Sequence, residues 1–224
     1  YRVEIAAYNA AGKHLEDYPD GASTDLRDAI GRAFGLDPDR IVCGAGSDEI
    51  LNLLAHTYLG PGDEAVMGDP AFVVYKLVTL LFGAKAVEVP LVNYRHDLPA
   101  LARAITPRTR LLMIPHMVNI TGHILPVRAI CDMAHARGVD VMVDGAHAFA
   151  QLDFRIPDLQ CDYYGASLHK WLSTPIGAGI LYVKRDKIGR LWPIYGDEGP
   201  KQDDIMKLNH TGTHPPHTDL GIEN

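Results

Sequence analysis

Short apolar runs alternate with longer segments of helical periodicity along most of the chain, and no other feature restricts its fold as much. Runs that suit strands lie at 40–43, 64–67, 86–89, 110–114, 139–143, 163–167 and 179–183, and helical patterns lie at 47–58, 71–82, 99–105 and 126–137. Strands that alternate with helices form mostly parallel sheets covered on both faces, and such strands are apolar throughout. The sequence therefore predicts an α/β fold, a three-layer αβα sandwich around a mostly parallel mixed sheet.

The size and charge of the chain indicate a globular protein and argue against nucleic-acid and membrane binding. It has 224 residues, of which 47% are hydrophobic, so it can bury a substantial core. We expect an N-terminal segment at 1–24, one large domain at 25–190, and a linker and tail at 191–224. The net charge of -7 argues against binding to nucleic acid, which needs basic patches. No apolar run approaches the roughly 18 residues that cross a bilayer, so no membrane association is expected.

Cysteine and histidine placement favours a cytoplasmic protein without a metal centre. Cys43, Cys131 and Cys161 are widely spaced and odd in number, which is typical of reduced thiols rather than of disulfides or zinc ligands. The chain opens with no charged-then-apolar leader, so export is not expected. The histidines between 210 and 217 are interrupted by prolines and accompany no acidic or cysteine pattern, so we expect no metal there.

Polar residues follow four of the predicted strands. The glycine-rich loop 44–49 follows the first strand, Asn119 lies a few residues beyond another, Asp144 directly follows a third, and Lys170 lies just past a fourth. In sheets of this kind, ligands bind beyond the carboxyl ends of the strands. We therefore expect these features to gather at one edge of the sheet and to form a single site.

The pair formed by Asp144 and Lys170 suggests a specific chemistry. Asp144 ends an apolar strand, and Lys170 comes 26 positions later, behind Ser167 and His169. A lysine amine can form a Schiff base with the aldehyde of pyridoxal 5'-phosphate. A carboxylate beside the pyridine nitrogen keeps that nitrogen protonated, and the protonated ring stabilises negative charge at the alpha carbon of an amino acid. We expect both residues to be catalytic; a surface lysine and a turn aspartate are the simpler alternatives.

The neighbours of Lys170 strengthen this interpretation. Leu168, Trp171 and Leu172 predict an apolar surrounding, which would lower the pKa of the amine and make it nucleophilic. His147, which follows the strand-ending aspartate, could stack on the cofactor or position the carboxylate, and we count it among the catalytic candidates. An ordinary loop histidine is an almost equally good interpretation.

The glycine-rich turn before the first predicted helix is a candidate anion site. Free backbone amides and the positive end of a helix dipole attract phosphate, and we expect Gly46, Ser47 and Asp48 to bind it. Ser167 and His169 can donate hydrogen bonds to the same phosphate. Glycines alone can mark no more than a tight turn, and it is the aspartate and lysine downstream that favour the phosphate.

Further side chains could contact the cofactor ring. Phe72, at the start of a predicted helix, could stack on the pyridine face, with Tyr75 one turn later as the substitute. Asn119 could hydrogen-bond the phenolic oxygen of the ring. The simpler interpretations are a core aromatic residue and an asparagine in a turn.

On these motifs, the chain resembles the fold-type I pyridoxal phosphate enzymes, the aminotransferase superfamily, from about residue 17 to 222. Through about residue 110 it is similar to histidinol-phosphate aminotransferases, with their Tyr-Pro-Asp-Gly, Gly-x-Gly-Ser-Asp-Glu and Thr-Pro-Arg-Thr-Arg segments. From about residue 116 it resembles class V aminotransferases, the group of cysteine desulfurases and isopenicillin N epimerase-like proteins. The Val-Asp-Gly-Ala-His-Ala, Ser-x-His-Lys-Trp-Leu and Gly-Thr segments carry that second likeness.

The resemblance implies a role for each residue that matches a family motif. Lys170 would be the Schiff-base lysine, Asp144 the partner of the pyridine nitrogen, Asn119 the contact of the ring oxygen and Phe72 the stacking aromatic. Thr213 matches a threonine that reaches the phosphate of the neighbouring subunit, which implies a homodimer with a shared site. The residues that match phosphate-loop positions are Ser47, Asp48, Ser167 and His169.

As a whole, the resemblance implies a pyridoxal phosphate-dependent aminotransferase that acts on an amino acid. One alternative is a class V lyase or epimerase of the desulfurase kind, which would need a mobile nucleophilic cysteine; Cys161, just before a strand, is poorly placed for that. The other is a truncated or chimeric domain that binds the cofactor without turnover. Both families continue into a small C-terminal domain with a carboxylate-binding arginine that nothing here matches, and 115–122 departs from the first family's asparagine–proline motif.

Overall fold

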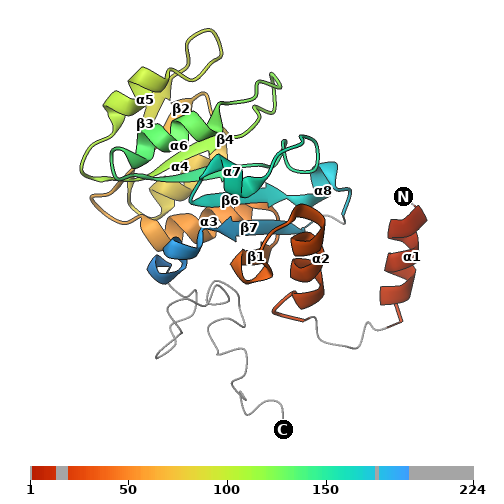
Figure 1. Cartoon of the computed structure of the whole chain (residues 1–224). Helices are drawn as coiled ribbons and strands as arrows, with labels where there is room; N and C mark the ends of the chain where they lie inside the picture. The colour runs from red at the N-terminus through yellow and green to blue at the C-terminus, as the bar shows by residue number, and fades with distance from the viewer. Residues whose placement is uncertain (1, 14–19, 175–176, 192–224) are drawn as a thin grey trace, which may run out of the picture.

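A computed structural model describes residues 2–13, 20–174 and 177–191 of the chain (Figure 1). One seven-stranded sheet runs through this described part, in the order β1-β7-β6-β5-β4-β2-β3. Its strands are β1 (Ile41–Gly44), β2 (Glu64–Asp69), β3 (Lys85–Pro90), β4 (Thr109–Pro115), β5 (Asp140–Asp144), β6 (Tyr163–Ser167) and β7 (Gly179–Val183). Strand β7 is antiparallel to both of its neighbours, β1 and β6, and the other pairings are parallel. The prediction of a mostly parallel mixed sheet is confirmed.

The connections between strands are mostly helical. The described helices are α1 (Arg2–Ala11), α2 (Thr24–Phe34), α3 (Ser47–Tyr58), α4 (Val73–Leu81), α5 (Leu98–Ala104), α6 (Val127–His135), α7 (Ile156–Leu159) and α8 (Leu168–Trp171), with the 3-10 helices η1 (Pro38–Arg40) and η2 (Arg185–Arg190). Helices at 2–11 and 24–34 were not predicted. The described side chains of α1 are all exposed, and α2 buries few residues, so neither carries a long apolar stripe. None of the described helices is long and apolar enough to cross a membrane.

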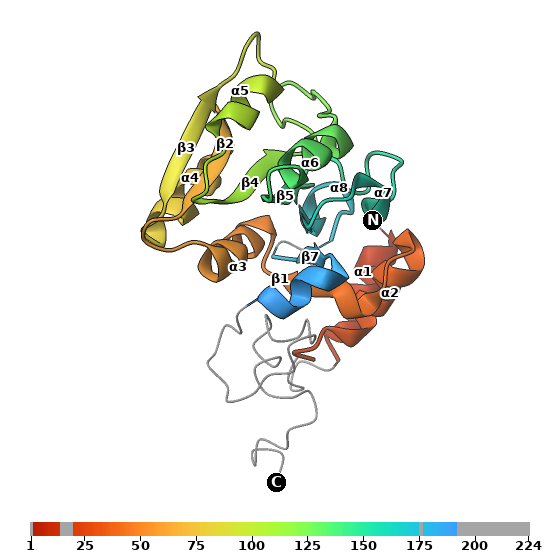
Figure 2. The same cartoon turned by 60° about the vertical axis from the view of Figure 1, so that its left-hand side comes forward.

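The two faces of the sheet form separate hydrophobic cores. Along β4, Leu112 and Ile114 belong to the core that packs against α2, α5 and α6, whereas Leu111 and Met113 belong to the core that packs against α3, α4 and η2. Figures 1 and 2 show α5 and α6 on one side of the sheet and α3 and α4 on the other. Because both faces are covered, the strands are apolar throughout. The predicted three-layer sandwich is therefore also confirmed.

Helix α4 begins later than its sequence pattern predicted. The pattern indicated a helix over 71–82, but Phe72 has an extended backbone and the helix covers Val73–Leu81. Phe72 therefore belongs to the turn between β2 and α4. That turn lies at the edge of the sheet where the parallel strands end, and this places the aromatic ring at the candidate site.

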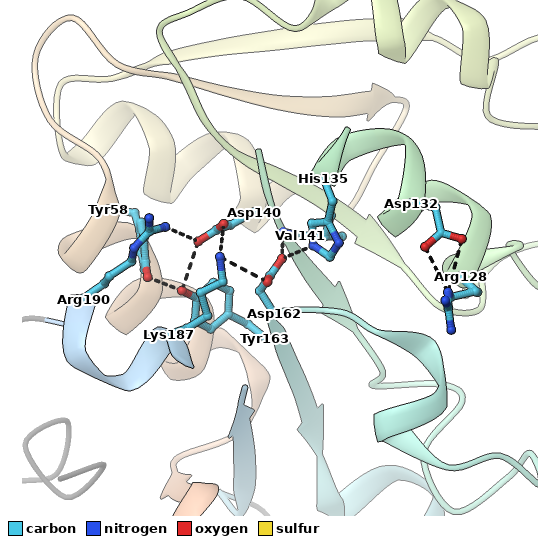
Figure 3. Close-up of polar contacts among 10 residues, drawn as sticks. All are labelled: Tyr58, Arg128, Asp132, His135, Asp140, Val141, Asp162, Tyr163, Lys187 and Arg190. Atoms are coloured by element: carbon cyan, nitrogen blue, oxygen red, sulfur yellow. Dashed lines mark hydrogen bonds and ion pairs between the residues drawn. The ribbon is translucent and has the colours of Figure 1, made fainter. Parts of the chain in front are cut away.

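The opposite edge of the sheet, where β5 and β6 begin, holds a network of buried charges (Figure 3). Lys187 of η2 lies 2.6 Å from Asp140 Oδ1 and 3.4 Å from Asp162 Oδ1. Asp162 Oδ2 also accepts the Val141 backbone N–H at 2.8 Å and lies 2.7 Å from Nε2 of His135. These partners offset the cost of removing two carboxylates from water. The network connects η2 to Asp140, the first residue of β5, and to Asp162, the residue before β6.

Replacing Lys187 by methionine should destabilise the fold strongly. The change keeps the apolar stem of the side chain but removes the buried cation that Asp140 and Asp162 share, and in the described part of the chain it leaves Asp140 with only the exposed cation of Arg190 at 3.5 Å; this costs about 3 kcal/mol or more. The free energy of unfolding in urea measures the effect. The exposed pair Arg128–Asp132, drawn in the same figure, supplies the control, and Arg128→Ala should change that free energy by no more than about 0.5 kcal/mol. Equal losses in the two variants would contradict this account of the network.

Candidate functional site

A cavity of about 200 Å³ opens at the edge of the sheet where the parallel strands end. The loops that follow β2, β3, β4 and β5 supply most of its lining, together with the start of α4 and with α8. The sequence candidates that line it are Phe72, Tyr75, Asn119, Asp144, His147 and Lys170. These residues are far apart in the sequence and meet because parallel strands bring their carboxyl ends to one edge.

Asp144 is the last residue of β5 and is 8% exposed. Its Oδ1 accepts the Ala146 backbone N–H at 2.9 Å, and its Oδ2 accepts the Tyr75 hydroxyl at 2.8 Å. Burial raises the pKa of this carboxyl above its ordinary value, and the two hydrogen bonds offset only part of that effect. Neither donor carries a positive charge, so a cation placed beside Asp144 in the cavity would stabilise the ionised form.

Tyr75 has a role that the sequence did not reveal. The sequence suggested it as a substitute for Phe72 in ring stacking, but Tyr75 is buried and its hydroxyl donates to Asp144. Burial and then the charge of Asp144 raise the pKa of Tyr75, so the hydroxyl stays protonated and remains a donor. Phe72 is 38% exposed at the cavity wall and meets Tyr75 edge to face, with ring centroids 5.9 Å apart. The helical spacing of the two residues was the one available signal, and it did not separate their roles.

The surroundings of Lys170 differ from the prediction. Its side chain is exposed, and Trp171 and Leu172 are 50% and 37% exposed, so these two neighbours do not enclose the amine as predicted. Consecutive residues of a helix face different directions, so Trp171, the last residue of α8, and Leu172, its C-cap, do not share the direction of Lys170.

Among the described residues, the Lys170 amine has a polar contact with His147, whose Nε2 lies 3.3 Å from Nζ. Burial, and then the charge of Lys170, lower the pKa of His147, which favours a neutral imidazole at neutral pH. A neutral imidazole whose Nε2 carries no proton can accept a hydrogen bond from the amine and orient it. His147 and Lys170 both line the cavity, so this contact lies at the candidate site.

Gly46, Ser47 and Ser167 come together where β1 and β6 end. Ser167 Oγ accepts the Ser47 backbone N–H at 2.9 Å and donates to Ser47 Oγ at 2.8 Å, which leaves the hydroxyl hydrogen of Ser47 for a further acceptor. Gly46 has a φ of 85°, and a Cβ on Gly179 would lie 2.5 Å from its backbone, so both positions require glycine.

His169 covers this loop. Its Cε1 would lie 3.5 Å from a Cβ on Gly46, and its Nδ1 is buried with no hydrogen-bond partner among the described residues. Helix α3 begins beside it with no side-chain cap, although the Ala45 N–H is bound by Glu49 Oε2 at 2.5 Å. Since buried polar atoms are nearly always paired, the orphaned nitrogen next to a helix N-terminus suits an anionic ligand.

The remaining candidates contribute less to the geometry. Asp48 is exposed in the first turn of α3, and Asn119 is exposed at the cavity wall. Thr213 and the histidines between 210 and 217 lie outside the described residues. Within the described ranges, no group of three or more His, Cys, Asp or Glu side chains is placed to hold a metal ion.

Comparisons with known proteins agree on one group. The model of the family described as aminotransferase class-V matches residues 4–217. The histidinol-phosphate aminotransferase of Rhodopseudomonas palustris (strain TIE-1) is 57% identical over 122 residues, which are 54% of this chain and 33% of that protein. The chain thus spans about a third of the length of that relative. The predicted resemblance to the aminotransferase superfamily is confirmed, both to histidinol-phosphate aminotransferases and to the class V family.

Two solved structures extend the likeness to the fold. The N-succinyldiaminopimelate aminotransferase of Mycobacterium tuberculosis is 28% identical, with a TM-score of 0.71 over 84% of this chain and 55% of that one. The cysteine desulfurase CsdA of Escherichia coli is 26% identical, with a TM-score of 0.69 over 86% of this chain and 56% of that one. Both an aminotransferase and a desulfurase therefore share the three-layer architecture.

Asp144→Asn should stabilise the cofactor-free chain at neutral pH. Because the folded-state pKa of Asp144 is raised, the folded chain holds the proton more tightly than the unfolded chain, and stability falls as pH rises from about 4 through the folded pKa. Asparagine keeps the shape and removes this ionisation. Urea unfolding at a series of pH values should show the fall in the parent and a flatter profile in the variant.

The exposed Asp153 provides the matched control, because Asp153→Asn should leave the pH profile of the parent unchanged. If Asp144→Asn were instead less stable than the parent across the range, Asp144 would be contributing its charge to the fold itself.

Proposed function

This chain belongs to the class-V aminotransferase family, and on that premise we propose that it binds pyridoxal 5'-phosphate at the carboxyl edge of its sheet and transfers the amino group of an amino acid. The observation that carries the proposal is the meeting of the Lys170 amine and the buried Asp144 carboxylate in one cavity. The domain that binds the cofactor is 25–190. The cytoplasm is the compartment that suits its free cysteines, Cys43, Cys131 and Cys161.

The residues present fit the cofactor at three points. The orphaned Nδ1 of His169, the Ser47 hydroxyl and the start of α3 form a cradle for a phosphate. Asp144, whose pKa is raised by burial, is stabilised by a pyridine nitrogen that carries a proton. Lys170 supplies the amine for covalent attachment. All three features lie along the same edge: the cradle where β1 and β6 end, Asp144 at the end of β5, which neighbours β6, and Lys170 in α8, directly after β6.

Pyridoxal phosphate, when bound, supplies an electron sink that stabilises negative charge at the alpha carbon of an amino acid. Asp144 maintains the positive charge that this sink needs, and Tyr75 fixes the direction of the carboxylate through its 2.8 Å hydrogen bond. Lys170 removes the proton from the alpha carbon of the substrate and returns one to the product. His147, 3.3 Å from the amine, orients Lys170 for that transfer.

Two side chains at the cavity wall contact the ring in this proposal. Phe72, in the turn that follows β2, borders the cavity and would stack on the cofactor ring. Asn119, from the loop after β4, would donate a hydrogen bond to the ring oxygen.

The alternative is a class V lyase of the desulfurase kind, which the likeness to CsdA favours. Desulfuration needs a nucleophilic cysteine near the substrate. Cys161 is 3% exposed, precedes β6 at the edge of the sheet away from the cavity, and has a pKa raised by burial. A buried thiol at the wrong edge cannot attack, so we place transamination first. A domain that binds cofactor without turnover is the remaining alternative.

Lys170→Ala should abolish exchange of the alpha proton of an amino acid with heavy water. The amine is the group proposed to move that proton, and general acid–base catalysis is worth at least about 100-fold in rate. The measurement is proton NMR of L-glutamine incubated with the chain and pyridoxal phosphate. Lys85→Ala, an exposed lysine far from the cavity, serves as the control and should exchange at the parental rate. Exchange at the parental rate in the Lys170 variant would refute the assignment.

We also propose a homodimer whose cofactor site is completed by Thr213 of the second copy. The exposed apolar face of α4, which starts next to Phe72, supports association of this side of the molecule, and its members are Val73, Leu77, Leu80 and Leu81. The partner is a second copy of the chain, because Thr213 matches the class V threonine that reaches the phosphate of the neighbouring subunit.

Mixing two defective chains tests this arrangement. Lys170→Ala and Thr213→Ala chains, combined in equal amounts, should form mixed dimers with one intact site, so half of the sites in these dimers regain parental cofactor affinity. Sedimentation gives the oligomeric state, and titration with pyridoxal phosphate gives the affinity. A monomeric parent, or a Thr213→Ala chain that binds cofactor as tightly as the parent, would show that the site is not shared.

A further inference from the structure

Two histidines of the described part have buried ring nitrogens without a hydrogen-bond partner, and they lie at opposite ends of the candidate site. His169 follows β6, and the proposed phosphate cradle accounts for it. His96 follows β3, the edge strand on the other side, and neither of its nitrogens is paired. A buried donor or acceptor that stays unpaired costs free energy, so an imidazole in this state requires an explanation.

The His96 ring is built into the cavity wall. It lines the same cavity as Lys170 and Asp144, and it packs directly on the backbone of β2. A Cβ on Gly68 would lie 2.7 Å from Nε2 of His96 and 3.0 Å from its Cδ2, so Gly68 makes the room that the ring occupies. The ring therefore lies against the sheet, in the space that the absent side chain of Gly68 leaves.

His96 lies beyond the reach of a ring that is bound at Asp144. Gly68 belongs to β2, which is separated from β5 by β4 alone, and neighbouring strands are about 4.8 Å apart, so the His96 ring lies roughly 10 Å along the edge from Asp144. The His169 end lies in the opposite direction. A group that meets His96 must extend away from the cofactor, which is the direction open to the side chain of a substrate.

The surroundings of His96 favour an uncharged partner. Burial, and then the nearby His123, lower the pKa of His96, so the ring is neutral at neutral pH and can both donate and accept. The cavity wall around it is mostly apolar or aromatic and includes Phe72, Leu91 and Tyr94. Asp144 is the one acidic residue in the described lining. An apolar chain with a polar, uncharged end matches this wall.

We propose that His96 is a specificity-determining residue that hydrogen-bonds an uncharged polar group, such as an amide, at the end of the side chain of the amino-acid substrate. The proposal rests on the proposed function, because it names the substrate class of the same site. It predicts a preference for long side chains with an amide end over isosteric hydrocarbon side chains.

The test compares L-glutamine with L-homoleucine, whose side chains have nearly the same shape and differ in the amide. Calorimetry with the cofactor-loaded chain should give glutamine a Kd about tenfold lower than that of homoleucine, because the hydrocarbon leaves the imidazole unpaired. His96→Phe keeps an aromatic ring in the wall and should abolish this preference. Gly68→Ala, which displaces the His96 ring without removing it, should weaken glutamine binding selectively.

His123→Phe is the matched control, because His123 lies on the neighbouring turn and does not line the cavity of the site. It should retain the tenfold preference. An unchanged preference in His96→Phe, equal affinities in the parent or no binding of either amino acid would overturn the proposal. The absorbance of bound cofactor, recorded in parallel, distinguishes failure of the proposed function from failure of the proposal for His96. If no cofactor absorbance is found, the proposed function is wrong. If the cofactor is bound but glutamine and homoleucine bind with equal affinity, only the proposal for His96 is wrong.

Discussion

A carboxylate buried at the end of a central strand is the constraint around which the candidate site is built. Asp144 lies where β5 stops, and its backbone is fixed on both sides, because its carbonyl accepts the His116 N–H at 2.8 Å and the next residue bonds to Gly165. Its side chain takes one backbone donor and the Tyr75 hydroxyl. Neither donor neutralises the negative charge of the carboxylate, so a cation nearby would stabilise the ionised form of Asp144.

The two edges of the sheet treat buried charge in opposite ways. At the edge where β5 and β6 begin, Lys187 compensates Asp140 and Asp162, and the result is structural. At the other edge the fold leaves Asp144 without a buried cation and leaves ring nitrogens of His96 and His169 unpaired. Functional sites often carry unsatisfied groups of this kind, at a cost to stability. The contrast within one sheet argues that the carboxyl edge is shaped for a ligand.

Much of this architecture could be predicted from the sequence, because continuous apolar strands and helical spacing report on packing at short range. The helix at 47–58 and the strands at 163–167 and 179–183 agree with the structure to the residue. The cavity residues Asp144, His147 and Lys170 could be found because each follows a strand, and parallel strands end at a common edge.

Contacts set by tertiary packing could not be predicted in this way. The sequence neighbours of Lys170 suggested an apolar surrounding, yet α8 turns Trp171 toward solvent. The sequence suggested Tyr75 as a stacking residue, but in the structure its hydroxyl donates a hydrogen bond to Asp144. His96 gave no sequence signal, because its importance comes from the space that Gly68 leaves two strands away from β5. Each of these depends on the angle between elements distant in the chain.

The amine that holds the cofactor distinguishes the proposed site from any other. The direct measurement is to load the chain with pyridoxal phosphate, reduce it with borohydride, digest it and map the modified peptide by mass spectrometry. The account predicts one stoichiometric adduct, on Lys170, that disappears when the chain is loaded in the presence of a competing aldehyde-trapping amine. An adduct spread over several surface lysines, or none at all, would contradict it.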